Sequence, residues 1–174
     1  MTDFNIRTFE QEDIPEIVET FTFSWTIPED LQKKWEKFYQ EQQNHLRTTY
    51  ILLIDNDIIG YGSLLKSSDY GEFNTKGIPE IKDIWVLEKF RRKGYGEKLI
   101  KHLEKMAREE GYKVIGIAVG LYRDYGSAQR LYVKMGYIPD GNGVTYINHF
   151  VTPGGIYRTD DDLVLWLTKK LECP

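Results

Sequence analysis

The chain has 174 residues, of which 41% are hydrophobic and 29% are charged, and its formal net charge is -4. This composition is typical of one globular domain, residues 1–174, that buries a core without disulfides or a structural metal. The negative charge offers no global attraction for nucleic acid, and the single cysteine, Cys173, excludes an intrachain disulfide and a cysteine-based metal site.

The N-terminal third predicts a strand, two helices and a β-hairpin. Apolar and polar residues alternate in the first strand. Each helix has a start signal, which is an aspartate in the first helix and a threonine in the second, and a proline follows two residues later. Asp13 and Glu16 have the spacing of a capping box. A short polar turn separates the two hairpin strands. The expected ranges are a strand over 4–9, helices beginning at 13 and 28, and strands over 49–54 and 58–66.

The rest of the chain predicts strands that alternate with helices. The stretch from Ser67 to Gly77 contains glycine and serine, and we expect it to be a loop. Glycines at 111 and 136 are expected to end the two helices. The expected ranges are strands over 81–87, 113–119, 144–151 and 162–170, and helices over 95–110 and 128–135. This order predicts an α/β fold with a mixed, mostly antiparallel twisted sheet and helices on both faces.

The turn before the helix at 95 reads Arg91-Arg92-Lys93-Gly94-Tyr95-Gly96. Backbone N–H groups at a helix start point out of the helix, and the helix dipole adds partial positive charge there. Such a turn suits a phosphate or pyrophosphate, and glycine lets the backbone approach the ligand closely. The alternative is a helix that simply begins at a glycine turn, and these six residues alone do not separate the two interpretations.

Two motifs in the chain resemble those of the GNAT family of N-acetyltransferases. The family's [R/Q]-x-x-G-x-[G/A] motif, which follows the fourth strand, matches 91–96. Its A-x-x-x-Y-x-x-x-G-[F/Y] motif, which follows the fifth strand, matches Ala128, Tyr132, Gly136 and Tyr137. The resemblance covers roughly 51–140, with the elements in the family's order. It implies the acyl-CoA N-acyltransferase fold and acetyl-CoA as co-substrate.

The resemblance also implies how coenzyme A is bound. The backbone of the turn would hold its pyrophosphate, and the end of the fourth strand would pair with the pantetheine arm. An N–H near Val86 or Leu87 would polarise the thioester carbonyl. The family often has an asparagine where this chain has Tyr125, which leaves Ser127 as a candidate hydrogen-bonding group or helix cap. The expected cofactor-binding residues are Ile84, Trp85, Val86, Arg91, Arg92, Lys93, Gly94, Tyr95, Gly96, Glu97, Ser127 and Tyr132.

Acetyl transfer to an amine needs a group that accepts the amine proton and benefits from one that protonates the departing thiolate. The resemblance makes Tyr132 the candidate proton donor; the alternative is a buried tyrosine on an apolar helix face. Glu80 matches the glutamate of the histone-acetylating branch, and Asp83 matches an acidic position in several members that acetylate small amines. Residues of opposite parity face opposite sides of a strand, so we expect only one carboxylate to face the acceptor, and we favour Glu80. A water chain without a dedicated base is the remaining alternative.

The expected function is therefore transfer of an acetyl group from acetyl-CoA to a primary amine, of a small molecule or an exposed peptide amine, by direct attack in a ternary complex. A non-catalytic acyl-CoA-binding regulatory protein is the alternative, and it would not need Tyr132. Acceptor recognition is expected in the two N-terminal helices and in 141–160, where Trp25, Tyr146 and Tyr157 either line a pocket or pack.

The sequence also predicts which ligands and partners the protein does not use. The three histidines show no metal-ligand spacing, so we expect no bound metal. The first residues lack the basic and apolar regions of a signal peptide, and no apolar run approaches membrane-spanning length. We therefore expect a cytoplasmic protein with neither a membrane nor nucleic acid as partner. The apolar strand predicted over 162–170 either forms a homodimer interface or packs in the core.

Overall fold

The computed structural model of the protein describes residues 4–22 and 26–172, so Trp25 and Cys173 lie outside the described residues. The strands are β1 (Phe4–Thr8), β2 (Arg47–Ile54), β3 (Asp57–Leu65), β4 (Glu80–Val86), β5 (Val114–Gly120), β6 (Ile138–Tyr146), β7 (His149–Phe150) and β8 (Leu163–Lys170). The α-helices are α1 (Ile14–Thr20), α2 (Pro28–Gln43), α3 (Gly71–Lys76), α4 (Tyr95–Glu109) and α5 (Gly126–Lys134). Short 3₁₀ helices are η1 (Gln11–Asp13), η2 (Glu88–Phe90) and η3 (Arg123–Tyr125).

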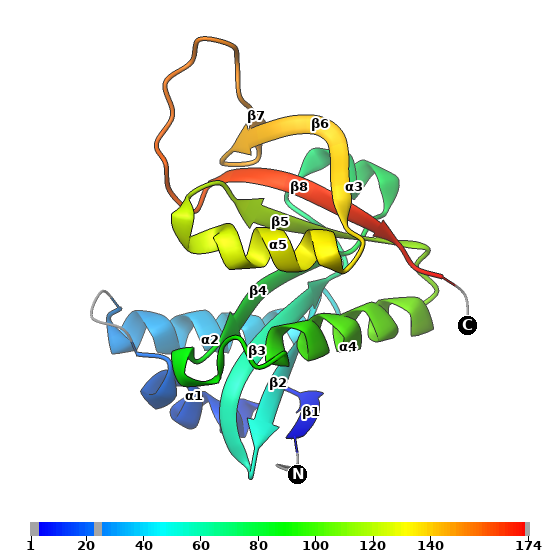
Figure 1. The fold of residues 1–174 in the computed structure, drawn as a ribbon. Coiled ribbons are helices and arrows are strands. Elements are labelled where there is room, and N and C mark those ends of the chain that lie inside the picture. The colour runs from blue at the N-terminus through cyan, green and yellow to red at the C-terminus, as the bar shows by residue number, and fades with distance from the viewer. Residues whose placement is uncertain (1–3, 23–25, 173–174) are drawn as a thin grey trace. The chain divides into compact units, whose positions relative to one another are not determined.

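The strands form an eight-stranded sheet in the order β1-β2-β3-β4-β5-β8-β6-β7 (Figure 1). The β4–β5 pair is parallel, whereas β1–β2, β2–β3, β5–β8, β6–β8 and β6–β7 are antiparallel. This confirms the expected α/β fold with a mixed, mostly antiparallel sheet. Among residues 4–22 and 26–172, no helix combines the length and the apolar character needed to cross a membrane.

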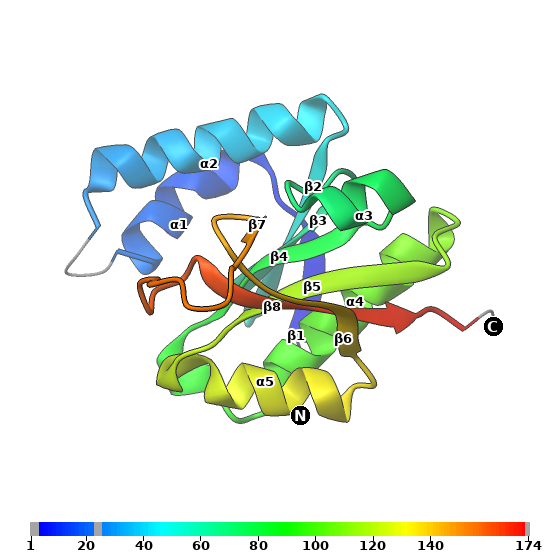
Figure 2. The same cartoon turned by 90° about the horizontal axis from the view of Figure 1, so that it is seen from above.

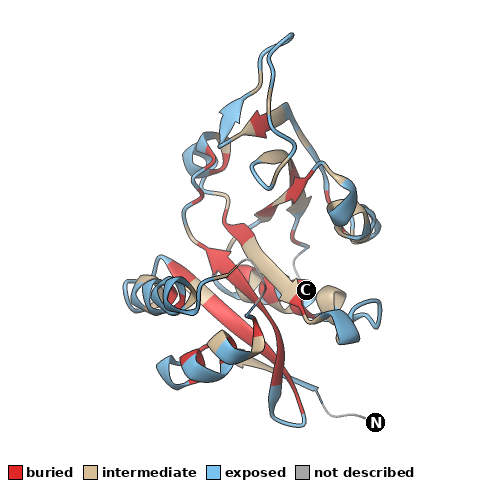
Figure 3. Ribbon diagram, turned by 90° about the vertical axis from the view of Figure 1, so that its left-hand side faces the viewer, coloured by how far each residue is buried: buried red, intermediate tan, exposed pale blue. Residues whose placement is uncertain are grey.

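The chain forms two compact units. The N-terminal unit comprises the residues up to Leu65 together with Asp83–Leu103, and the C-terminal unit comprises Lys66–Lys82 together with the residues from Glu104 onward. Both β4 and α4 therefore contribute residues to each unit. In each unit the buried residues gather on the strands, and the outer faces of the helices are exposed (Figure 3).

In the N-terminal unit, helices cover both faces of the strands. Ile51 and Leu53 of β2 pack in one buried cluster with Trp35 of α2. The alternate residues, Leu52 and Ile54, pack in another cluster against the start of α4. This alternation follows from the two-residue period of a strand. It places α1 and α2 on one face and the beginning of α4 on the other (Figure 1).

The start of the first helix differs from the sequence prediction. The capping box joins Glu10 and Asp13, because the Glu10 N–H donates to Asp13 Oδ2 at 2.8 Å. Arg7 also donates to this carboxylate, at 2.7 Å. Glu16 instead accepts a hydrogen bond from the Ile58 N–H at 3.0 Å. The predicted Asp13–Glu16 box was wrong because tertiary partners on β1 and β3 engage both carboxylates.

In the C-terminal unit, the segment predicted as a loop contains the short helix α3. Phe73 is its buried anchor, and it packs with Tyr70 and Trp166, whose rings stack at 4.2 Å between centroids. A Cβ added at Gly116 of β5 would lie 2.1 Å from the Phe73 ring, so glycine is needed for this packing. A single apolar anchor gives no helical periodicity, which explains why the sequence pattern missed this helix.

Helices also lie on both faces of the C-terminal unit, with α3 and α5 on opposite sides of β5 and β8 (Figure 2). The strand predicted over 144–151 is two strands. β6 begins earlier, at Ile138, and turns at Ile147 and Asn148 into the short β7. Both turn residues have positive φ, 48° and 62°. Asparagine often adopts this conformation and isoleucine rarely does, so the turn carries only a weak sequence signal.

Candidate active site

The segment that follows β4 folds back onto the end of that strand. The Leu87 N–H donates to the Ile59 carbonyl of β3 at 2.9 Å. The Arg91 Nε donates to the Val86 carbonyl at 2.8 Å, and its guanidinium carbon lies 4.9 Å from the centroid of the Trp85 ring. The Arg91 side chain therefore braces the end of β4.

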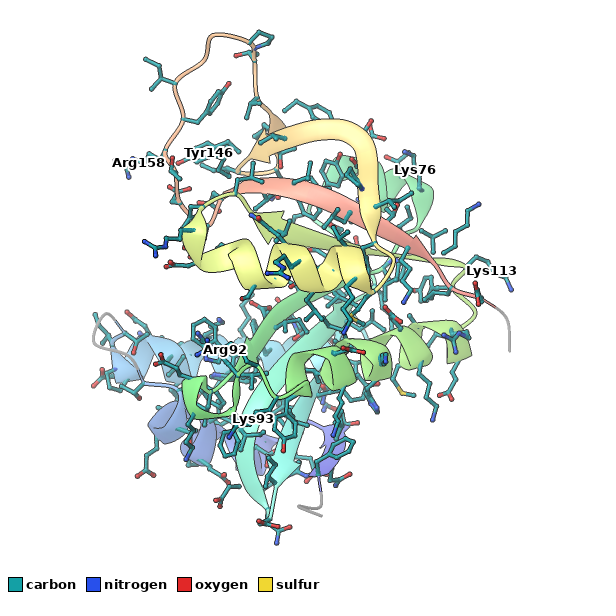
Figure 4. All side chains as sticks on the ribbon, viewed as in Figure 1. Lys76, Arg92, Lys93, Lys113, Tyr146 and Arg158 are labelled. Carbon is teal, nitrogen blue, oxygen red and sulfur yellow. The ribbon has the colours of Figure 1, made fainter. Side chains whose placement is uncertain are left out.

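The glycine turn itself has an unusual backbone. Arg92 and Gly94 both adopt positive φ, 59° and 84°. A Cβ at Gly94 would meet no atom within 4 Å, so the space above the turn is open. Arg92 and Lys93 are exposed on the segment that leads into α4 (Figure 4). Because α4 runs for 15 residues from Tyr95, its N-terminal dipole and first-turn N–H groups add to this positive site.

Strand β4 is not regular. Asp83 has a φ of 56°, in the left-handed region, in the middle of the strand. The residues from Lys82 to Trp85 are all half-buried, without the alternation of a regular strand. Glu80 and Asp83 were expected to face opposite sides because side chains alternate along a regular strand. That premise was wrong, because the strand is interrupted at Asp83 itself.

The two candidate bases have different surroundings. In the N-terminal unit, Asp83 Oδ2 accepts a hydrogen bond from Arg47 at 2.7 Å, and Oδ1 lies 4.0 Å from the Lys34 ammonium. In the C-terminal unit, Glu80 is 1% exposed. Its Oε2 accepts a hydrogen bond from the Ser68 hydroxyl at 2.5 Å. Its Oε1 lies 3.9 Å from the Lys82 ammonium. Both carboxylates are thus next to cations, but Glu80 is the more deeply buried of the two.

The second motif lies on α5 of the C-terminal unit. Tyr132 is buried there, and burial raises its pKa to about 12. Ser127 is exposed inside the helix, after the N-cap residue Tyr125, so it does not cap the helix. The Tyr125 ring covers Gly120, and its hydroxyl donates to Asp161 Oδ1 at 2.9 Å. Tyr125 is therefore committed to packing and to a hydrogen bond with Asp161.

Two candidate acceptor residues of the sequence analysis, Tyr146 and Tyr157, contact each other in the C-terminal unit. Their ring centroids lie 5.7 Å apart. Tyr146 also donates a hydrogen bond to Asp160 at 3.2 Å, and the Tyr157 hydroxyl accepts one from the Thr152 N–H at 2.8 Å. Figure 4 shows Tyr146 beside the loop that follows β7. Both tyrosines thus stabilise this loop.

The N-terminal unit also has a shallow cavity, wide open to solvent, at the end of α1. It has a volume of about 610 Å³ and is lined by Thr20, Leu87, Glu88 and Lys89. Three of these residues directly follow β4. The cavity therefore lies next to the strand end that the sequence resemblance associates with the thioester.

Comparisons with known proteins agree with this geometry. The model of the acetyltransferase (GNAT) family matches residues 14–137. An uncharacterised N-acetyltransferase from Lactobacillus delbrueckii subsp. lactis is 27% identical over 150 residues, which cover 78% of this chain and 85% of that protein.

Solved structures show the same fold. The ribosomal-protein-S18-alanine N-acetyltransferase from Escherichia coli aligns with a TM-score of 0.66 at 15% identity, covering 99% of this chain and 96% of that one. An acetyltransferase from Salmonella typhimurium with its cofactor acetyl-CoA aligns with a TM-score of 0.68 at 15% identity, with the same coverage of 99% and 96%. Because the family model matches well over half of the chain, in the expected order of motifs, the chain belongs to the GNAT family of acetyltransferases.

Proposed function

We propose that the protein transfers an acetyl group from acetyl-CoA to a primary amine by direct attack in a ternary complex. The observation that carries this proposal is the exposed turn at Arg92 and Gly94, whose backbone opens onto free space at the start of a 15-residue helix. A pyrophosphate fits such a turn because backbone N–H groups and the helix dipole together favour an anion. The related Salmonella typhimurium structure holds acetyl-CoA, which supports the same co-substrate here.

The end of β4 is the proposed site of the pantetheine arm and the thioester. Ile84, Trp85 and Val86 would offer backbone groups to the arm, as an added strand would use them. Since the Leu87 N–H is already bonded to Ile59, it is not the proposed donor to the carbonyl. Successive residues of a strand direct their N–H groups to opposite edges, so we assign this donor to Val86. A hydrogen bond there would stabilise the charge that develops on the carbonyl oxygen.

The acceptor amine is proposed to enter by the cavity lined by Thr20, Leu87, Glu88 and Lys89. Glu88 is exposed there and is the acidic residue of this lining. The Glu88 carboxylate could accept a hydrogen bond from a protonated amine there, while Lys89 of the same lining offsets its longer-range attraction. This assignment agrees with the expectation that the N-terminal helices contribute to acceptor recognition.

The proposed function is tested by incubating the purified protein with acetyl-CoA and a panel of amines, and by following release of the coenzyme A thiol. The panel includes polyamines, simple alkylamines and short peptides with a free N-terminal alanine, since the related Escherichia coli enzyme modifies an alanine. We expect amine-dependent thiol release for at least one class. Tight binding of acetyl-CoA with no release for any amine would instead indicate the non-catalytic regulatory protein.

We propose Glu80 as the group that accepts the amine proton. An amine with a pKa near 10.4 is neutral in only about one molecule in a few thousand at pH 7, so a base matters most at low pH. Glu80→Gln is expected to lower kcat/KM by about tenfold to a hundredfold at pH 7. The deficit should shrink as the pH rises toward the amine's own pKa, because the neutral amine then becomes abundant. The pH profile of kcat/KM measures this.

The control is Glu104→Gln, another buried carboxylate of the C-terminal unit, whose oxygens lie 2.8 and 2.9 Å from the Lys169 ammonium. This variant should lose stability without changing the shape of the pH profile. A loss in Glu80→Gln that is the same at every pH would contradict a base at this position and favour a water chain.

A further inference from the structure

The N-terminal unit contains a buried polar cluster around Arg47, the first residue of β2. Arg47 is 6% exposed. Its Nη1 donates to Asp83 Oδ2 at 2.7 Å and to the Ser63 hydroxyl at 2.9 Å, and its Nε donates to Glu41 Oε2 at 2.7 Å. The guanidinium carbon also lies 3.7 Å from the centroid of the Phe38 ring. One side chain therefore joins α2, β3 and β4.

The contact with β4 falls on the residue where that strand is irregular. Asp83 has a φ of 56°, and it is also the first residue of β4 that belongs to the N-terminal unit. The two β4–β5 residue pairs, Glu80–Gly116 and Ile81–Ile117, precede it. An aspartate can adopt the left-handed conformation, but inside a strand it needs contacts that hold it there.

Arg47 supplies such a contact because it is itself fixed. Three groups restrict the Arg47 guanidinium to one orientation: the Phe38 ring, the Ser63 hydroxyl and the Glu41 carboxylate. In this orientation, Nη1 donates to Asp83. The Ser63 hydroxyl is in turn 2.9 Å from the Thr49 hydroxyl, and both residues are fully buried. A charge-assisted hydrogen bond from so rigid a donor restricts the position of the Asp83 side chain and hence its backbone.

The conformation of Asp83 decides where the following residues point. If Asp83 became extended, the backbone after it would leave in another direction, because φ sets the course of the following chain. At present Ile84 packs over Gly62, where an added Cβ would lie 2.5 Å from its Cδ1. The Trp85 carbonyl lies over Gly60, 2.7 Å from the position of an added Cβ. These close approaches show that the direction of the strand end is tightly specified.

We propose that Arg47 is a positioning residue for acetyl-CoA: through Asp83 it holds the irregular point of β4 and so orients the backbone of Ile84, Trp85 and Val86. The inference rests on the proposed function, which places the pantetheine arm along these three residues. Arg47 is buried, and its proposed role is to act through Asp83 and not by contact with either substrate. Lysine cannot replace it, because an ammonium group lacks the planar fork that reaches Glu41 and Asp83 together.

The test compares Arg47→Lys with Glu41→Gln. Arg47→Lys loses the fork that reaches Asp83. Glu41→Gln keeps a side-chain oxygen that can accept from Arg47 Nε, and Ser63 and Phe38 still hold the guanidinium, so this variant should leave the contact with β4 in place. We expect Arg47→Lys to weaken acetyl-CoA binding by at least about tenfold, since small displacements of a binding backbone have large effects. Glu41→Gln should leave the dissociation constant within about twofold, whatever its effect on thermal stability. Amide hydrogen exchange in a peptide spanning residues 80–90 should accelerate in Arg47→Lys and not in Glu41→Gln.

A double-variant cycle tests whether Arg47 acts through Asp83. Asparagine at 83 keeps an acceptor oxygen and tolerates the left-handed conformation, so Asp83→Asn should weaken binding less than Arg47→Lys. Combined, the two changes should be no worse than Arg47→Lys alone, because they affect one contact. Additive losses, or equal losses and equal exchange in Arg47→Lys and Glu41→Gln, would overturn the inference alone. Failure of the wild-type protein to bind acetyl-CoA would overturn the proposed function, and the inference with it.

Discussion

Gly94→Pro is expected to weaken acetyl-CoA binding by more than about a hundredfold, or roughly 2.7 kcal/mol. Gly94 has a φ of 84°, whereas proline fixes φ near -65°. The substitution therefore forces the turn into another conformation and redirects the N–H groups that are proposed to hold the pyrophosphate. Calorimetric titration of the folded variant with acetyl-CoA measures the effect. An unchanged dissociation constant would show that the cofactor does not use this turn.

Two alanine variants separate a loss of acetyl-CoA binding from a loss of stability caused by backbone strain. Gly94→Ala and Gly111→Ala lie at opposite ends of α4, with φ of 84° and 91°, and neither added Cβ would meet an atom within 4 Å. Each should destabilise the protein by about 1–2 kcal/mol, the cost of a Cβ in the left-handed conformation. Only Gly94→Ala should weaken acetyl-CoA binding, because only that turn is proposed to contact the co-substrate. Equal affinities in the two variants would contradict this assignment.

The parts of the fold that the sequence predicted correctly are those with local signals. The hairpin between β2 and β3 was predicted from its polar turn, and Asp55 and Asn56 there both have the positive φ of a tight hairpin turn. The glycine turn before α4 was predicted from Gly94 and Gly96, and Gly94 has a φ of 84°, which glycine adopts without steric cost. In these cases, the residue type and the required conformation agree within a few positions.

The parts that the sequence could not predict depend on contacts between distant residues. Asp83 stands in an apolar stretch that reads as an ordinary strand, and its left-handed conformation is held by Arg47, 36 residues earlier. The Leu87 N–H is not available to the thioester carbonyl, because it already donates to the Ile59 carbonyl on β3. Arg47 gave no hint, because the strand predicted from the sequence began only at residue 49, whereas β2 begins at Arg47. No periodicity or motif encodes such pairings, which exist only once the strands are assembled.

Tyr132→Phe is expected to lower kcat by about a hundredfold while acetyl-CoA affinity stays within about twofold. Burial raises the pKa of Tyr132 to about 12, so its phenol stays protonated at neutral pH. A thiol has a pKa near 8.5, and complete proton transfer to the thiolate would therefore cost about 5 kcal/mol. We therefore propose that the phenol donates a hydrogen bond to the departing sulfur rather than releasing a free proton. Steady-state kinetics and calorimetric titration measure the two quantities.

The raised pKa of Tyr132 also predicts how kcat depends on pH. Because the protonated phenol persists to higher pH than that of an ordinary tyrosine, wild-type kcat should show no decline due to Tyr132 up to about pH 10, and only approach one near pH 12. Tyr137→Phe is the control, since Tyr137 is 1% exposed in the same unit, burial raises its pKa as well, and its ring centroid lies 6.1 Å from that of Tyr132. A hundredfold loss confined to Tyr132→Phe would support a role in the reaction. Equal losses in both variants would assign Tyr132 to packing, because two neighbouring buried hydroxyls would then contribute alike.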